Sequence, residues 1–429
     1  MQRIIDLHAH PSLKMYYLPF LGANFHALVY NGTHWNPFAF QLQYRELSRS
    51  GIKVMLCAHY VIEQGFLKEG ISFLPGRAFF WAAGPYWYWR MRNRDPWQAV
   101  NRMMEITESA VPNTNRWLRG NQPRLKLVRR FAEIAQLAEN EIGLVHAIEG
   151  AHALGYQPKK GQTLDDFWIQ TRQRLDELER RGVAMLTLAH FWDNIFVPQT
   201  DGTESVPKVR HGRVVAGRDD LLFHMKRATW HFGDPQRLGE RLVRDLLDRG
   251  ILVDLSHVQE HAREAIYGLC EEYRRPVVVS HVGLQHFHRH EYNLSDAEIK
   301  RVHRLGGVAG LILSKRLLVD PLKRHRDAGE GIPTLVENMI YIRDLVGDVS
   351  CIALGTDFDG LTHPFKDCHA ASKMPRIAEA MKGYFNAEEI DDILFNNALR
   401  VLERGWGRRP GESRPAGTSA KPARKRGRK

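Results

Sequence analysis

Cysteine is scarce in this sequence, with only four residues among 429, and no two of them form a CxxC pair. This spacing argues against a disulfide framework and against a zinc site built from cysteines. The chain also lacks a run of about 18 apolar residues that would cross a membrane, and its start, MQRIIDLHAH, leaves no room for a signal peptide. We therefore expect a protein of a reducing compartment, the cytoplasm. The cysteines are Cys57, Cys270, Cys351 and Cys368.

Signatures of nucleotide binding are missing too, because the chain has neither a GxGxxG segment nor a Walker loop. The net charge of +12 would suggest a nucleic-acid partner, but residues 405–429 hold nine Lys or Arg and one Glu, which leaves only +4 for the rest. This tail is rich in Gly, Pro and Ser and has no apolar period, so we expect it to be disordered. Contact between the tail and nucleic acid or another polyanion is the less favoured interpretation.

What the chain does have is a repeat of short apolar runs, rich in Val, Ile and Leu, that alternate with amphipathic stretches of helical period. Eight parallel strands joined by helices most simply close into an α/β structure of the (β/α)₈ TIM barrel type. We expect the barrel to occupy residues 1–404, and an open doubly wound sheet is the alternative. The predicted strands are residues 3–8, 52–58, 143–148, 183–188, 251–256, 276–280, 307–312 and 350–355.

Two long segments interrupt the repeat. Residues 59–130 contain half of the ten tryptophans and a dense run of 11 residues, FFWAAGPYWYW, which is too short to cross a bilayer. We expect a tryptophan-rich insertion that acts as a packed lid or as the interface of a homodimer, with a membrane-surface patch less favoured. Residues 193–234 are polar and predict a loop over the barrel mouth. The tryptophans of the first segment are Trp81, Trp87, Trp89, Trp97 and Trp117.

Polar residues stand at the ends of the predicted strands, where a barrel places its active site. His8 and His10 share one face of the first strand because side chains alternate, so two imidazoles could hold one metal ion. The alternative is a pair of merely polar residues at a strand end. Glu149 ends the third strand, where a metal would offset the cost of burying a carboxylate and where a salt bridge is the alternative.

Two more strands end in the similar segments VDLSHV and VVVSHV, which place His257 and His281 at equivalent points of their βα units. The eighth strand ends in ALGTDFDG, where Asp357 could move a proton between a metal-bound water and a leaving group, whereas Asp359 better suits a turn. Imidazole and carboxylate ligands of this kind suit one or two zinc ions. The full set is His8, His10, Glu149, His257, His281 and Asp357.

Longer segments around these residues occur in an order and spacing typical of the membrane (renal) dipeptidase family of the amidohydrolase superfamily. The chain resembles this metal-dependent hydrolase family over about residues 1–404, with the specific similarity starting at residue 143. The segments are AIEGAHALG, LTLAHFWDN, GILVDLSHV, PVVVSHVG, IALGTDFDG and ILFNNALRVL.

The resemblance implies a binuclear zinc site in which Glu149 bridges the two ions. It implies that His8 and His10 bind one ion and that His257 and His281 bind the other. The family usually has an HxD pair on the first strand, so His10 replaces an anionic ligand with a neutral one. This difference leaves open whether the chain holds one or two zinc ions.

A second difference concerns the substrate. The family's Arg that holds the substrate carboxylate corresponds here to Tyr292, so a free C-terminal carboxylate loses its bidentate partner. Arg289 or Arg316 is the candidate replacement. The resemblance also implies that His190, in LTLAH, contacts the scissile group of the substrate.

These observations lead to the hypothesis of a zinc-dependent, dipeptidase-like metallopeptidase. A hydroxide held by the zinc ions would attack the amide carbonyl, His190 would stabilise the oxyanion, and Asp357 would pass the proton of the water to the leaving amine. The first alternative keeps the metals but takes N-acyl amino acids, lactones or other small amides and esters as substrates. The second, less favoured, is a non-catalytic protein whose basic tail binds a polyanion.

Overall fold

Eleven strands lie in the part of the chain that the computed structural model describes, namely residues 2–17, 22–26, 40–63, 94–191, 194–200, 209–210, 213–214, 238–319, 331–360 and 364–408. All eight predicted strands are present. The strands are β1 (Ile4–Ala9), β2 (Ile52–Tyr60), β3 (Arg124–Val128), β4 (Glu141–Glu149), β5 (Met185–Thr187), β6 (Val209–Arg210), β7 (Arg213–Val214), β8 (Leu252–Asp254), β9 (Val278–Val282), β10 (Val308–Leu311) and β11 (Ile352–Leu354).

Eight of these strands close a parallel barrel in the order β2-β1-β11-β10-β9-β8-β5-β4, because β2 pairs with both β1 and β4. The predicted (β/α)₈ barrel is therefore confirmed, and the open sheet is not formed. β3 is an additional strand that pairs with the first half of β4, while β5 pairs with the second half of the same edge. The antiparallel pair β6–β7 falls inside the segment predicted as a loop.

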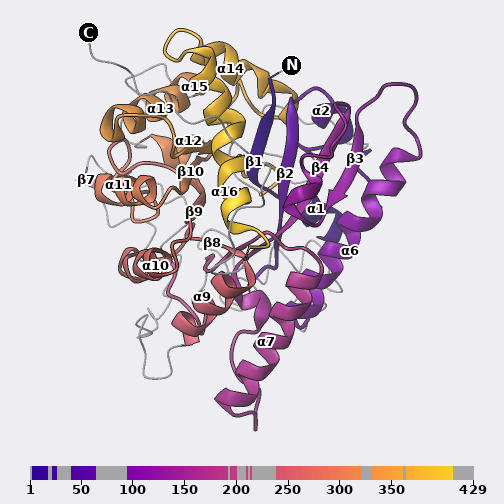
Figure 1. Cartoon of the computed structure of the whole chain (residues 1–429), viewed down its shortest axis with the longest axis vertical. Helices are drawn as coiled ribbons and strands as arrows, with labels where there is room; N and C mark the ends of the chain where they lie inside the picture. The colour runs from indigo at the N-terminus through magenta and orange to yellow at the C-terminus, as the bar shows by residue number, and fades with distance from the viewer. Residues whose placement is uncertain are drawn as a thin grey trace.

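The helices follow one another around the outside of the strands (Figure 1). They run from α6 and α7 through α9 and α10 to α11 and α13, as a barrel with helical crossovers requires. The α-helices are α1 (Pro11–Tyr17), α2 (Tyr44–Leu47), α6 (Pro96–Asn115), α7 (Leu164–Arg180), α9 (Leu238–Arg249), α10 (Glu260–Glu272), α11 (Asp296–Arg304), α12 (Lys315–Leu318), α13 (Ile332–Val346), α14 (Pro375–Met381), α15 (Ala387–Asp391) and α16 (Asn397–Gly405).

Local sequence signals set several helix ends. The Ser295 side chain accepts a hydrogen bond from the backbone N–H of Glu298, and Glu298 accepts one from Ser295 N–H, so α11 begins with a capping box. Helix α13 ends at Gly347, whose φ of 89° is a left-handed conformation that favours glycine.

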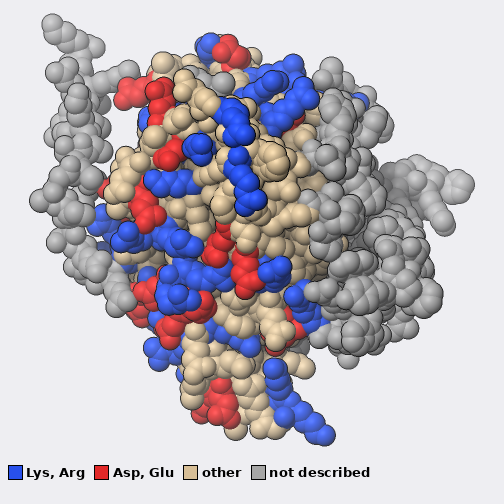
Figure 2. Space-filling model, turned by 90° about the vertical axis from the view of Figure 1, so that its right-hand side faces the viewer, with Lys and Arg blue, Asp and Glu red and all other residues tan. Residues whose placement is uncertain are grey.

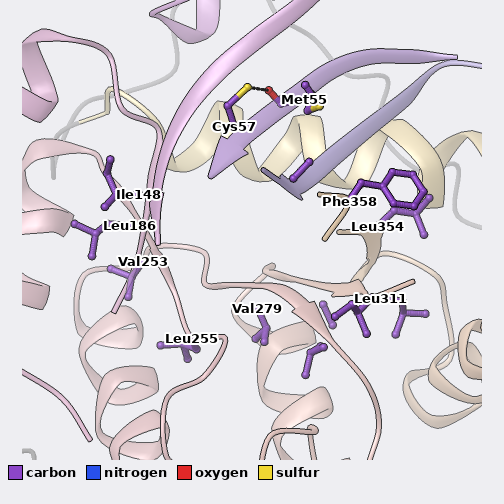
Figure 3. Packing of buried hydrophobic residues seen from close by; sticks show 14 of the residues in the cluster. Met55, Cys57, Ile148, Leu186, Val253, Leu255, Val279, Leu311, Leu354 and Phe358 are labelled. Atoms are coloured by element: carbon purple, nitrogen blue, oxygen red, sulfur yellow. Dashed lines mark hydrogen bonds between the residues drawn. The ribbon is translucent and has the colours of Figure 1, made fainter. Parts of the chain in front are cut away.

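A layer of apolar side chains fills the space between strands and helices. Figure 3 shows side chains of this layer from β2, β4, β5 and β8 to β11, among them Cys57, Ile148 and Val253. Helix residues such as Leu175 and Leu246 belong to the same cluster. Because side chains alternate along a strand, Ile148 faces this layer while its neighbour Glu149 faces the inside of the barrel.

Helix α16 closes the floor, the end of the barrel where the strands begin. The Arg400 guanidinium donates hydrogen bonds to the backbone oxygens of Gly306 and Ser350, just before β10 and β11. A Cβ atom on Gly405 would lie 2.1 Å from a methyl carbon of Leu252, so only glycine allows the helix to come this close to β8. Trp406 is buried in the same apolar cluster.

Two sequence predictions change with the fold. The disordered tail was expected from residue 405, but Gly405 ends α16, Gly407 N–H donates to Gly250 O, and Arg408 O accepts from Arg275, so the ordered chain continues to 408. Residues 409–429 lie outside the described residues. The second half of the predicted tryptophan-rich insertion packs with the barrel, because 96–115 form the helix that follows β2 and 124–128 form β3, the additional strand that pairs with β4.

The tryptophans divide in the same way. Trp97 packs against the main apolar cluster and Trp117 is 68% exposed. Trp81, Trp87 and Trp89 lie outside the described residues, so the lid or interface expected there stays a prediction.

Charges of both signs are mixed on the described surface. On the face in Figure 2, Lys and Arg side chains lie among Asp and Glu side chains, as the nearly balanced charge of the body predicts. Exposed ion pairs such as Arg301–Glu271 account for part of this mixture. The four cysteines are buried free thiols. Among the described helices, none combines the length and the apolar character that a membrane span needs.

Candidate functional site

The ends of five barrel strands bring polar side chains together at the mouth of the barrel. His8 lies near the end of β1 and Glu149 at the end of β4, and both are buried. His257 follows β8, and His281 lies on β9. Asp357 N–H donates a hydrogen bond to His8 O, which joins the end of β1 to the loop after β11 and places Asp357 beside the other polar side chains.

Glu149 is the centre of this cluster. Its Oε1 atom lies 3.2 Å from His8 Nε2, 3.5 Å from His257 Nε2 and 3.4 Å from His281 Nε2. Its Oε2 atom lies 3.4 Å from His10 Nε2 and has no hydrogen-bond partner among the described residues. Four of the five predicted metal ligands thus converge on both oxygens of the fifth.

The histidines form two close pairs around this carboxylate. His8 Nε2 and His10 Nε2 are 3.0 Å apart, and His257 Nε2 and His281 Nε2 are also 3.0 Å apart. Two nitrogens that bind one tetrahedral zinc at 2.0–2.1 Å lie about 3.3 Å from each other. The spacing within each pair is therefore close to that of two ligands of a common ion.

Among the residues that the structure describes, three overlapping groups of side chains could each hold a metal ion, and within each group the donor atoms lie within 4.8 Å of one another. These groups are His8 with His10 and Glu149, His8 with Asp254 and His281, and Glu149 with His190 and His257.

The negative charge of the buried Glu149 is stabilised by positive charge close to it. Burial alone would raise the pKa of Glu149, but the positive charges of His190 and His8 outweigh it and hold that pKa well below its usual value. Burial lowers the pKa of His8, yet Glu149 more than compensates and raises it to about 9. The buried carboxylate is thus ionised and favours a proton on His8, whereas burial lowers the pKa of His257 and of His281. A divalent cation would supply positive charge in place of that proton.

Residues behind the histidines hold them in place. The Ser280 hydroxyl lies 3.1 Å from His8 Nδ1 and 2.9 Å from His281 Nδ1, and donates to Asp254 Oδ2 at 2.5 Å. Outer partners of this kind fix the orientation of metal-binding imidazoles. Sequence reasoning missed Asp254 and Ser280, although the repeated Ser-His pair in VDLSHV and VVVSHV was an available signal.

Asp357 projects into the cluster from the loop after β11. Its Oδ1 atom lies 3.1 Å from His10 Nε2, and its φ of 56° is left-handed, a strained conformation for a residue other than glycine. A Cβ atom on Gly360 would lie 1.9 Å from Asp357 Oδ1, so glycine is required for this approach. His257 shares the left-handed conformation with a φ of 65°.

Asp359 has a different environment from Asp357, as the turn interpretation predicts. Its carboxylate pairs with Lys14 Nζ at 2.7 Å and accepts the backbone N–H groups of Gln41 and Leu42. These contacts tie the loop after β11 to the segment after α1, so Asp359 supports the mouth rather than facing the cluster.

Comparison with known proteins agrees with this arrangement. Residues 235–405 match the family model of membrane dipeptidase, peptidase family M19. The predicted resemblance to the membrane dipeptidase family is confirmed. Within sequence relatives, Dipeptidase tcpJ of Claviceps purpurea is 26% identical over 225 residues, which make up 52% of this chain and 45% of that protein. The matched part therefore spans about half the length of this relative.

Solved structures show the same fold. A dipeptidase AC of family M19 superposes with a TM-score of 0.63 and 19% identity over 95% of this chain and 99% of that one. A metallopeptidase of Rhodobacter sphaeroides, solved with a phosphinate mimic of the dipeptide L-Ala-D-Ala, has a TM-score of 0.65 and 18% identity over 94% and 99% of the two chains. At this identity the likeness establishes the barrel alone.

The residues that the family resemblance implies for the substrate lie in different places. His190 is buried in the cluster, with Nε2 3.7 Å from Glu149 Oε2. Tyr292 is also buried there and donates its hydroxyl to His281 O at 2.6 Å. Arg289 is exposed on the turn after β9 and does not join them. The side chain of Arg316 lies outside the described part.

Sequence reasoning missed a second carboxylate at the mouth. Glu63 follows β2, is fully buried, and its Oε1 atom lies 2.9 Å from His190 Nδ1. The signal was available, since Glu63 follows an apolar strand just as Asp357 does, but the weak similarity to the membrane dipeptidase family before residue 143 drew no attention to it.

Proposed function

We propose that the chain is a zinc-dependent hydrolase of amide bonds that acts on small molecules, most simply dipeptides. The observation that carries this proposal is the convergence of four imidazole nitrogens on both oxygens of the buried Glu149. Burying an ionised carboxylate is costly without a compensating charge, and a cation at this point would provide it.

The donor set fits zinc, because imidazole and carboxylate are ligands that zinc prefers. His8 and His10 would hold one ion and His257 and His281 the other, with Glu149 between them. The orphaned Oε2 atom of Glu149 supports a second contact on that side. Such ions polarise the carbonyl of the substrate and acidify a bound water.

Two further side chains would act on the reacting atoms. Asp357 would accept a proton from the attacking water and return it to the leaving amine. This role is supported by its Oδ1 atom, which lies 3.1 Å from His10 Nε2, the nitrogen that also borders Glu149. His190 directs its Nε2 atom toward the cluster and would donate a hydrogen bond to the carbonyl oxygen as negative charge develops there.

A second candidate function rests on Tyr292. Its hydroxyl is engaged with the backbone oxygen of His281 and its ring packs edge-on against His257 at 4.9 Å. An uncharged aromatic group therefore lies where the family resemblance implies a carboxylate-binding Arg. The cation Lys14 does not replace that Arg, because it is paired with Asp359. This environment favours N-acyl amino acids, lactones or other substrates without a free carboxylate at that end.

The experiment is amine release from free L,L and L,D dipeptides and from their N-acylated and C-amidated forms by zinc-loaded protein. We expect cleavage of at least one class and a drop of about 10²–10⁴-fold in kcat for Asp357→Asn, with zinc still bound. Cleavage of free dipeptides supports the first candidate, and cleavage of blocked substrates alone supports the second. A zinc-loaded protein that releases no amine from any of them would refute both. Cytoplasmic location and a homodimer stay predictions.

A further inference from the structure

Glu63 is a buried carboxylate that the proposed chemistry does not use. It accepts three hydrogen bonds: Oε1 from His190 Nδ1 at 2.9 Å and from Phe191 N–H at 3.0 Å, and Oε2 from the Tyr60 hydroxyl at 2.5 Å. All three donors lie at the barrel mouth, and two of them are His190 and its neighbour. Glu63 thus contacts the His190 imidazole, the backbone of the next residue and the Tyr60 hydroxyl.

These contacts decide which nitrogen of His190 faces the cluster. An ionised carboxylate can only accept hydrogen bonds, so His190 Nδ1 must carry a proton and point at Glu63. Burial would raise the pKa of Glu63, but the charges of His190 and His152 lower it to about 2, which keeps the carboxylate ionised. The opposite nitrogen, Nε2, then lies 3.7 Å from Glu149 Oε2. Donation of a hydrogen bond from Nε2 to a substrate oxygen requires that the ring be doubly protonated, since Nδ1 already carries a proton.

Aromatic rings fix the remaining freedom of the imidazole. The Tyr60 ring lies 4.0 Å from that of His190 at an angle of 44°, and the Phe191 ring lies 4.0 Å away at 66°. The rings restrict tilting of the imidazole, while the bond to Glu63 prevents rotation about the ring normal. Tyr60 contributes twice, because its ring packs against His190 and its hydroxyl donates a hydrogen bond to Glu63.

We propose that Glu63 is a positioning residue that orients His190, so that Nε2 meets the carbonyl oxygen of the substrate. This inference rests on the proposed function, since it assigns Glu63 a part in amide hydrolysis. Glu63 acts through His190 and does not contact the substrate. It is comparable to the carboxylates that orient metal-binding histidines, whose loss costs about 10–100-fold in metal affinity or activity.

The test compares Glu63→Leu, Glu63→Gln and Glu108→Gln, all zinc-loaded. Leucine removes every acceptor, whereas glutamine keeps one acceptor for His190 Nδ1–H and can donate to Tyr60. Glu108 is the matched control because it also accepts from a buried histidine, His146, at 3.3 Å, but on the outer side of the barrel wall.

We expect Glu63→Leu to lower kcat about 10–100-fold with KM changed less than about threefold. Glu63→Gln should recover most of kcat, and Glu108→Gln should keep it. A second readout is independent of turnover: in protein labelled with ¹⁵N-histidine, the downfield Nδ1 proton of His190, assigned by its loss in His190→Gln, should vanish in Glu63→Leu and persist in Glu108→Gln.

Three results would overturn the inference. The first is an unchanged kcat in Glu63→Leu, the second is a loss of kcat that follows only a loss of bound zinc or of folded protein, and the third is a downfield proton that survives in Glu63→Leu. An inactive wild type that retains zinc refutes the proposed function instead, so the two failures are distinguishable.

Discussion

At the mouth of the barrel the strands end in buried polar side chains, whereas at the floor they begin against the apolar face of α16. The mouth contains three residues other than glycine in left-handed conformations, His257, Asp357 and Asp359. Each such residue costs about 1–3 kcal/mol unless the surroundings compensate it. At the floor, Trp406 and Leu402 lie in an apolar cluster, and only one such residue, Arg274 with a φ of 54°, is described there, just before β9.

This difference shows that the two ends of the barrel contribute differently to the stability of the fold. The buried charges of Glu149 and its histidines lower the stability of the mouth but give it chemistry, and the floor holds the strands from which those side chains project. Changes at the mouth should therefore affect turnover before stability, and changes at the floor should do the reverse.

Removal of the metal should have the largest effect and should be confined to the mouth. After chelation we expect no turnover and a loss of unfolding free energy of about 4 kcal/mol relative to zinc at 1,000 times its Kd. Hydrogen exchange should speed up at the ends of β4 and β9, because Glu149 and His281 lose their common partner, but not in α16. Readdition of zinc is the control, and equal loss of protection in α16 would contradict the contrast between the two ends.

Truncation at the floor should give the opposite result. Trp406→Ala removes a large side chain that is 4% exposed, and we expect a loss of about 3–5 kcal/mol in unfolding free energy with kcat unchanged at 25 °C. Trp117→Ala, at a side chain that is 68% exposed, should change stability by less than about 0.5 kcal/mol. Denaturant unfolding measures both. A selective loss of kcat in folded Trp406→Ala would show that the floor also controls the chemistry.

The sequence allowed the barrel to be predicted because strands that are buried on both faces are continuous apolar runs. The strand β3, RLKLV, was missed because it alternates apolar and charged residues and pairs with β4 alone. The long helix α6 was read as part of an insertion because tryptophans upstream of it dominated the composition.

The site was predictable where the fold itself positions it. Glu149, His257 and Asp357 come at or just after strands, and a closed barrel must bring such positions together. Glu63 and Asp254 were missed because their role depends on a partner distant in sequence, His190 for one and Ser280 for the other. Periodicity indicates which face a residue occupies, but it does not identify the side chain opposite.

The barrel wall, where the strands pack against the outer helices, should give the smallest effect of the three regions. It tests the comparison of mouth and floor because it buries polar groups that have no chemical role in the proposed function. His59 and His146 lie 2.8 Å apart between the strands and the outer helices, next to Ser12 and Glu108. Burial lowers the pKa of both, with the charge of Arg181 adding to it, so both are neutral in the folded protein.

A lowered histidine pKa makes the folded state sensitive to acid. The unfolded chain takes up protons as the pH falls through about 6.5, and the folded chain does not, so stability present above that pH is lost below it.

We expect the two histidines to lower the free energy of unfolding by about 1–3 kcal/mol between pH 7.5 and 5.5. Carboxylates such as Glu63, whose pKa is about 2, change stability only at lower pH. Urea unfolding of His59→Gln should show a smaller pH dependence than the wild type, and Trp117→Ala, a control at an exposed side chain that does not titrate, should show the wild-type dependence. Equal slopes in wild type and His59→Gln would mean that His59 takes up its proton without unfolding, and the wall would then resemble the mouth in tolerating buried charge.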